Sequence, residues 1–206
     1  CFNVVFVSSI GFQPNLGSAQ AYDNQCNVLA TAAGLNNPTG NAFVAWVSTT
    51  NSNVLNRLGP NARGFLRPDG VPLADTVNDL LANNALWNPI RVDELGNDVG
   101  WKVVMTGTRY NGTTASTQNC ADWTVTTGSL LLLAGSTAGG PLFWTQIIAA
   151  DCNQGPFRIY CFQNNRNRAL VPPQSPGKVI YLTNTLFTPG GGLAAAILFL
   201  VFEYLA

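Results

Sequence analysis

The cysteines constrain this chain more than any other feature of its sequence. There are five, Cys1, Cys26, Cys120, Cys152 and Cys161, in a chain without histidine. None stands in a Cys-x-x-Cys pair, so their spacing fits neither a zinc ribbon nor a thioredoxin-type redox motif. Widely spaced cysteines in a charge-poor chain are typical of disulfides made in an oxidising compartment. We therefore expect two internal disulfides and an extracellular or cell-surface location.

An odd number of cysteines leaves one without an internal partner. We expect this to be Cys1, because a chain terminus is rarely buried. Three explanations of Cys1 stay open: a lipid attached as in bacterial lipoproteins, a disulfide to another subunit, or no role beyond standing first in this sequence. A lipid on Cys1 would be the only membrane attachment that we expect.

The composition argues against several classes of function. Without histidine there is no Ser-His-Asp or Cys-His catalysis, and the commonest metal ligand is missing. Charged residues are 10% of the chain, and ten basic residues balance ten acidic ones, so charge does not favour binding to nucleic acid. We expect no enzyme, no cofactor and no metal. A carboxylate-based hydrolase and an oxygen-ligand calcium site are the alternatives considered.

Hydrophobic periodicity predicts a mixture of strands and helices. Short apolar runs predict strands at 2–8, 42–47, 101–106 and 158–162. Apolar spacings of three and four predict a helix at 19–33, with Ser18 as its N-cap and Gly34 after its end, and a second helix at 72–83. We expect 51–67 to be irregular, 128–140 to be a surface loop, and 143–149 to be a strand or helix.

Several short motifs follow one another in a recognisable order. They are Gln25-Cys26, Ala-Phe-x-Ala-Trp at 42–46, Arg-Pro-Asp-Gly at 67–70, Asn-Pro-Ile-x-x-Asp-Glu at 88–94, Thr-Gly-Thr at 106–108, Cys-x-x-Trp at 120–123, then Cys152 and Tyr-Cys-Phe at 160–162. Over residues 2–162 this set resembles the endostatin-like branch of the C-type-lectin-like fold, which includes bacterial surface proteins of unknown function.

The resemblance implies an α+β domain in which Cys26 bonds Cys161 and Cys120 bonds Cys152. Other properties of the fold family do not carry over. Endostatin is basic and binds heparin and zinc, whereas this chain is neutral and lacks histidine. The nearest match to a lectin calcium motif, at 13–15, lies beside the first strand rather than in a late loop. We therefore expect no calcium-dependent sugar binding.

Three groups of residues have both a functional and a structural interpretation. The densest acidic cluster consists of Asp93, Glu94 and Asp98, and we interpret it as a solvated loop rather than a weak calcium site. We interpret Asp69 as a turn residue. Asn111 begins an N-glycosylation sequon, but Asn-Gly there also predicts a hairpin turn, which we favour. The five tryptophans could form a sugar-stacking platform; we expect most, including Trp46, Trp101 and Trp123, in the core.

The sequence divides into a domain at 1–162, a Pro-rich linker at 163–177 and a C-terminal segment at 178–206. Residues 179–189 align without gaps to 4–14, so this segment starts like a second copy of the first strand. The apolar tail at 193–206 is shorter than the ~20 residues of a membrane span. It also contains Glu203.

Two interpretations of the C-terminal segment stay open: a truncated tandem domain whose tail packs on its own body, or exchange of the strand with a neighbouring copy. We favour exchange and expect a self-assembling extracellular structural or adhesive protein, such as a filament subunit. The alternative is a monomeric cell-surface module that binds carbohydrate or protein. The residues expected at the assembly contact are Val179, Ile180, Tyr181, Leu182, Leu186, Phe187, Ile197, Leu198, Phe199, Leu200, Val201 and Phe202.

Overall fold

The first strand lies in the middle of a five-stranded sheet. In the computed structural model, which describes residues 1–35, 42–81 and 85–171, β1 (Asn3–Val7) pairs in parallel with β3 (Arg63–Leu66) and antiparallel with β8 (Tyr160–Gln163). β2 (Phe43–Ala45) and β4 (Pro72–Thr76) complete the order β2-β8-β1-β3-β4. β1 is apolar and buried along nearly its whole length, because both faces of this sheet are covered.

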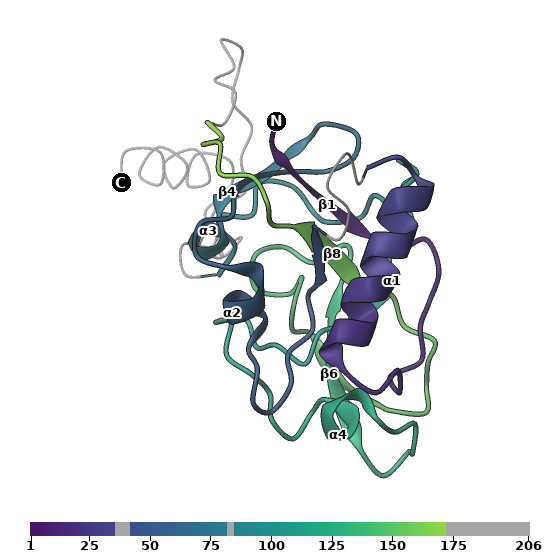
Figure 1. Cartoon of the computed structure of the whole chain (residues 1–206). Helices are drawn as coiled ribbons and strands as arrows, with labels where there is room; N and C mark the ends of the chain where they lie inside the picture. Colours follow the sequence, from purple (N-terminus) through teal and green to yellow (C-terminus); the bar gives the residue numbers. More distant parts are fainter. Residues whose placement is uncertain (36–41, 82–84, 172–206) are drawn as a thin grey trace, which may run out of the picture. The chain divides into compact units, whose positions relative to one another are not determined.

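Helix α1 (Ala19–Ala32) packs beside this sheet (Figure 1). It begins where predicted, since the Ser18 side chain accepts a hydrogen bond from the Ala21 N–H. It ends one residue earlier than predicted, before Gly34 with its φ of +71°. Its buried face carries Cys26, which is bonded to Cys161 of β8. This disulfide joins the helix to the middle of the sheet.

A smaller sheet contains β5 (Val103–Met105), β6 (Leu131–Ser136) and β7 (Ile148–Asp151), all antiparallel. A second disulfide, Cys120–Cys152, joins the short element α4 (Cys120–Trp123) to the residue that follows β7. The fold is thus mixed α+β with two disulfides, and these are the two pairings that the resemblance implies.

Aromatic rings fill the core between the elements. Trp46 lies 4.6 Å from Trp144 and 4.9 Å from Phe162, measured between ring centroids, and all three side chains are fully buried. Such tilted pairs add to the burial of a large apolar area. The expectation that Trp46 and Trp123 lie in the core is confirmed, but Trp101 is 62% exposed, so the expectation for that residue is wrong.

The structure corrects three predicted elements. The stretch at 51–67 is not irregular, because it contains α2 (Val54–Leu58) and β3. The helix predicted at 72–83 is a strand, β4, followed by α3 (Val77–Leu81). The boundary is set by a capping box: Thr76 Oγ1 accepts from the Asp79 N–H at 3.1 Å, and Asp79 accepts from the Thr76 N–H at 2.8 Å.

The third correction concerns 128–140, predicted as a surface loop. It contains β6, the central strand of the smaller sheet. Gly135 is required within it, because a Cβ there would stand 1.9 Å from the Trp144 carbonyl oxygen. Two of the glycines that suggested a loop, Gly135 and Gly139, instead let the segment at Phe143 and Trp144 pack closely against the backbone.

The compact unit, which we call the body, extends from Cys1 to Val171, beyond the predicted domain boundary at 162. The Arg166 N–H donates to Asn3 Oδ1 at 3.0 Å, and the Leu170 N–H donates to Asp75 Oδ1 at 2.7 Å. The first part of the predicted linker is therefore bonded to the body. The remainder of the linker, 172–177, and the predicted assembly segment, 178–206, lie outside the described residues.

Candidate functional site

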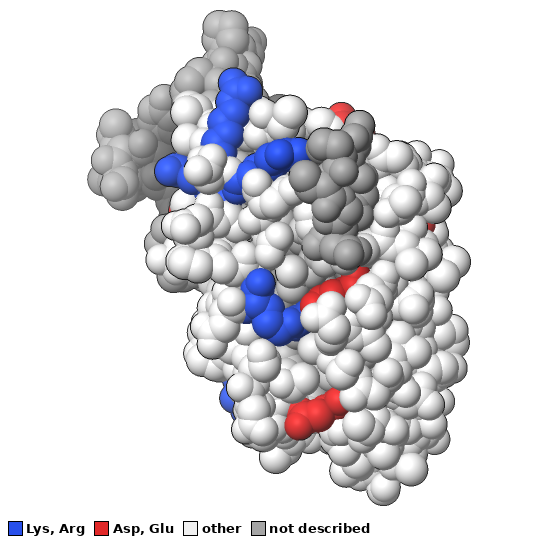
Figure 2. All heavy atoms as spheres, in the orientation of Figure 1, with Lys and Arg blue, Asp and Glu red and all other residues white. Residues whose placement is uncertain are grey.

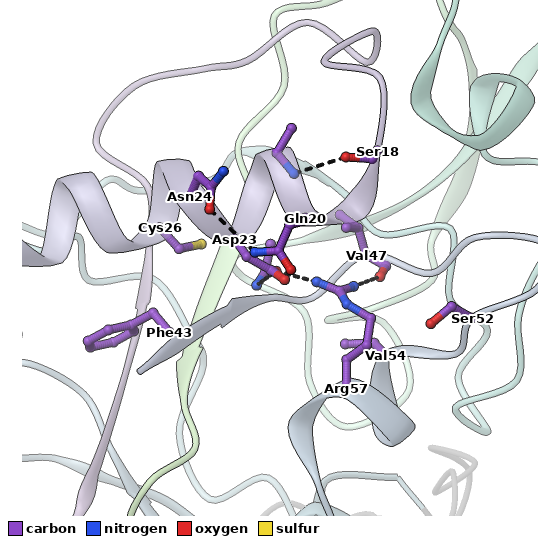
Figure 3. Close-up of polar contacts among 12 residues, drawn as sticks. Ser18, Gln20, Asp23, Asn24, Cys26, Phe43, Val47, Ser52, Val54 and Arg57 are labelled. Carbon is purple, nitrogen blue, oxygen red and sulfur yellow. Dashed lines mark hydrogen bonds and ion pairs between the residues drawn. The ribbon is translucent and has the colours of Figure 1, made fainter. Parts of the chain in front are cut away.

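A buried ion pair joins α1, β2 and α2 (Figure 3). The Asp23 residue is only 6% exposed. Its carboxylate accepts hydrogen bonds from the Ala45 N–H, at 2.7 Å, and from the Arg57 guanidinium. Arg57 also donates to the Val47 carbonyl oxygen at 2.6 Å. Because each charge is bonded to the other and to the backbone, the pair fixes the two helices against β2.

A small pocket of about 300 Å³ opens above this pair. The amide of Asn27, at its edge, donates to the Phe43 carbonyl oxygen and accepts from the Phe43 N–H, at 2.8 and 3.0 Å. The polar side chains here are thus engaged with β2, and the pocket offers an ion pair rather than a separate acid and base. It is lined by Gln20, Asp23, Asn24, Asn27, Phe43, Val44 and Arg57.

A larger pocket, of about 950 Å³, lies between α2 and the β3–β4 pair. Four asparagines line it, together with Arg63. The charge of Arg63 is offset by an ion pair with Asp75, and the hydrogen bond that the guanidinium donates to this carboxylate raises the pKa of the guanidinium. Amide groups both donate and accept hydrogen bonds, which suits uncharged polar ligands. The asparagines are Asn56, Asn61, Asn78 and Asn167.

The predicted acidic cluster does not converge on one point. Glu94 accepts from the N–H and the hydroxyl of Ser9, whereas Asp93 accepts from the backbone N–H of Asn97 at 2.8 Å. Asp98 instead pairs with Arg91, whose hydrogen bond lowers the pKa of the Asp98 carboxyl. Asp93 and Glu94 are each 5% exposed, so the solvated-loop interpretation is wrong for them. Asp93 closes a backbone turn, and Glu94 joins its loop to Ser9 after β1.

No metal-binding group emerges from these contacts. In the ranges that the structure covers, no three acidic or cysteine side chains gather closely enough to hold an ion. Asp69 lies in a turn, as predicted, and accepts from the Val71 N–H at 3.3 Å. Its hydrogen bond from Arg67 lowers the pKa of its carboxyl.

Asn111 lies in the predicted hairpin turn. Its side-chain oxygen accepts from the Thr113 N–H and hydroxyl, at 3.1 and 2.7 Å, and the Gly112 N–H donates to the Arg109 carbonyl oxygen. Asn111 is exposed, so its glycosylation stays a prediction. Cys1 is exposed and unpaired within the described part of the chain.

An unexpected strained element is α4. Its four residues have φ between +52° and +66°, so the chain makes a left-handed helical turn, which costs about 1–2 kcal/mol per residue. Asn119 bonds Asp122 twice, through the Asp122 N–H at 3.1 Å and the Asp122 carboxylate at 2.7 Å. The Trp123 indole donates to the Ser48 carbonyl oxygen at 3.0 Å. These bonds and the Cys120–Cys152 disulfide hold the turn in place.

Sequence reasoning missed both pockets and the Asp23–Arg57 pair. One signal was present: Asp23 lies next to Tyr22 and one turn before Cys26, on the face of the helix that the apolar spacing buries. A carboxylate there needs a partner. Nothing local identifies Arg57, which is 34 residues away in the chain and in a segment predicted to be irregular.

The exposed surface shown in Figure 2 carries few charged side chains among the described residues, as the composition predicts. Within the same ranges, no helix has the length and apolar character needed for a membrane crossing. Searches with the sequence find no matching protein-family model and no similar curated protein. The endostatin-like resemblance therefore stays a prediction.

Proposed function

We propose that this protein is an extracellular structural or adhesive subunit that assembles with copies of itself and performs no catalysis. One observation carries the proposal: residues 179–189 repeat the pattern of 4–14, which contains all of β1 except Asn3. In the body, β1 has hydrogen-bonded neighbours on both sides, β3 and β8. A second copy of this strand therefore has no vacant equivalent position in its own body.

The features of the body support an extracellular role. Two buried disulfides favour an oxidising environment, and a neutral surface suits neither nucleic acid nor anionic lipid. The small pocket offers a mutually bonded ion pair, and the large one offers amides beside an ion-paired Arg63. Both arrangements suit binding or stability better than proton transfer.

The proposal is tested by comparing the particle masses of the full chain and of a truncated chain. The full chain should form a larger particle than a chain ending at residue 177 when both are measured by analytical ultracentrifugation without reductant. Both should carry Cys1→Ser, so that a disulfide between subunits does not contribute to the mass. If the particles of the two chains contain the same number of copies, with both internal disulfides intact, the proposal is contradicted.

A monomeric binding module for carbohydrate or protein is the second candidate, favoured by the asparagine-lined pocket. Amides can bond sugar hydroxyls without metal, which agrees with the missing lectin calcium motif. Glycan-array binding that persists in EDTA and is lost in Asn61→Ala and Asn78→Ala would support it. Asn153→Ala, which is exposed and lines neither pocket, is the control. Binding that is equal in all three variants would exclude the pocket.

A further inference from the structure

In the part of the chain that the structure describes, β7 is an edge strand of the smaller sheet. Among the described strands β7 pairs only with β6, through the register Leu132↔Ala150. The Cys152 N–H donates to the Leu130 carbonyl oxygen. Because bonded and non-bonded pairs alternate in antiparallel ladders, Ala149 directs its N–H and carbonyl away from β6. No other described residue bonds these two groups.

The side chains at this edge are apolar and exposed. Leu142, Phe143, Ile147 and Ile148 are between 43% and 54% exposed, and we call these four residues with β7 the β7 edge. From residue 123 to 150 the sequence contains no Asp, Glu, Lys or Arg. Natural sheet edges usually carry charges, prolines or bulges that prevent pairing with other chains. Here only Asp151, the last residue of β7, is charged, and an apolar exposed edge of this kind is an interaction surface.

We infer that the β7 edge binds the β7 edge of a second copy, antiparallel about a two-fold axis. The outward groups of Ala149 set the register, because they pair with the same groups of the other copy. Asp151 then lies opposite Ile147 of the other copy. The two Asp151 carboxylates are separated by four residues along the strands, ~13 Å, which exceeds the screening length of about 8 Å at physiological salt.

A second copy suits this edge better than a foreign protein. The edge has no charge, apart from Asp151 at its end, with which to select an oppositely charged partner. Its antiparallel register is self-complementary. The four exposed side chains leave on the order of 400 Å² uncovered, so a pair of copies buries on the order of 800 Å² from them. This is less than the roughly 1,200–2,000 Å² that stable specific interfaces bury and indicates a weak, reversible dimer.

This interface goes beyond the proposed function, because it does not use residues 178–206. Cysteine trapping on the full chain tests it directly. In the inferred register, Ala149 lies about 5.5 Å from its counterpart, Cα to Cα, within disulfide range. In a Cys1→Ser background, Ala149→Cys should form a disulfide-linked dimer under mild oxidation. Val28→Cys, which is also exposed but lies on α1, should not.

A second variant and an exchange measurement complete the test. Ile148→Lys should weaken dimerisation at least about tenfold, through lost apolar burial, whereas Val28→Lys should not. Hydrogen exchange at residues 147–151 should slow as protein concentration rises. Equal trapping of Ala149→Cys and Val28→Cys would overturn the inference. So would protection that is independent of concentration, since the edge would then be covered by its own chain.

The two proposals fail independently. Suppose that particles of the chain ending at 177 contain as many copies as those of the full chain, while Ala149→Cys forms the disulfide-linked dimer. The β7 dimer is then supported and assembly through the C-terminal segment is wrong. If truncation reduces the particle mass while Ala149→Cys is not trapped, the opposite holds. Circular dichroism and disulfide mapping of each variant establish that the body is folded.

Discussion

Replacing Tyr160 with phenylalanine should stabilise the protein. Tyr160 is fully buried in β8, and its hydroxyl has no hydrogen-bond partner among the described residues. Burial also raises the pKa of this hydroxyl, as expected for a phenol without a polar partner. A buried polar group left unbonded costs about 1–3 kcal/mol. Tyr160→Phe removes that penalty, so we expect the free energy of unfolding to rise by about 1 kcal/mol.

Tyr22 provides the matched control, because it is equally buried but bonded. Its hydroxyl donates to the Gln13 carbonyl oxygen at 2.7 Å and accepts from the Leu16 N–H at 3.4 Å. Tyr22→Phe removes a good hydrogen bond and leaves backbone groups unpaired, so it should lower the free energy of unfolding by about 1–2 kcal/mol. The same chemical change thus has opposite signs at the two sites.

Urea unfolding at pH 7 without reductant measures both changes. The two variants and the parent should have equal m-values, so that midpoints compare directly. We expect the order Tyr160→Phe, parent, Tyr22→Phe, from the most to the least stable. If Tyr160→Phe is destabilised as much as Tyr22→Phe, the Tyr160 hydroxyl is hydrogen-bonded in solution and the argument is refuted.

Four further predictions concern the same body. Ala121→Gly should raise the free energy of unfolding by about 1 kcal/mol, since Ala121 has a φ of +52°, whereas Ala32→Gly at the end of α1 should lower it. If the melting temperatures of both variants shift in the same direction, this prediction is wrong. Removing the Cys26–Cys161 disulfide, with its separation of 135 residues, should cost about 5 kcal/mol in the chain-entropy model, against about 4 kcal/mol for Cys120–Cys152 with 32; urea unfolding of the paired Cys→Ala variants measures the order. Burial raises the pKa of Tyr22 and Tyr160, so the unfolded state loses these protons first: the stability from this source is unchanged below pH ~10 and falls as the pH rises above it. A melting temperature flat from pH 9 to 12 would argue against it. Asp23→Asn should cost about 2–3 kcal/mol, because the largely buried Arg57 is left without a charged partner. Asp98→Asn, at an exposed pair, should hardly change the melting temperature.

Local patterns predicted the elements that depend on local interactions. Helix α1 follows from its apolar spacing and its Ser18 cap, both of which act within a few residues. β1 follows from the short, mostly apolar run at 2–8. The boundary between β4 and α3 was missed, because the apolar spacing at 73–81 also fits one helix. The capping box of Thr76 and Asp79 was the signal that distinguishes the two.

Long-range contacts explain the errors. β6 was predicted as a loop because it is rich in Gly and Ser at its end, but Gly135 is there to admit the backbone of Trp144. Trp101 was assigned to the core as the first residue of the strand predicted at 101–106, but β5 begins only at Val103 and Trp101 lies in solvent. The Asp23–Arg57 pair and the asparagine-lined pocket join segments that no local pattern connects.

The strained turn α4 and the β7 edge are connected by a disulfide. Cys120, in the left-handed α4, is bonded to Cys152, the residue after β7, and the Cys152 N–H is bonded to Leu130 at the start of β6. One end of β7 is therefore fixed before any partner arrives. Because this edge is already ordered, the free energy of association does not have to offset the entropy cost of ordering it. A dimer that buries only on the order of 800 Å² requires this advantage, so reducing Cys120–Cys152 should weaken the β7 contact even where the body stays folded.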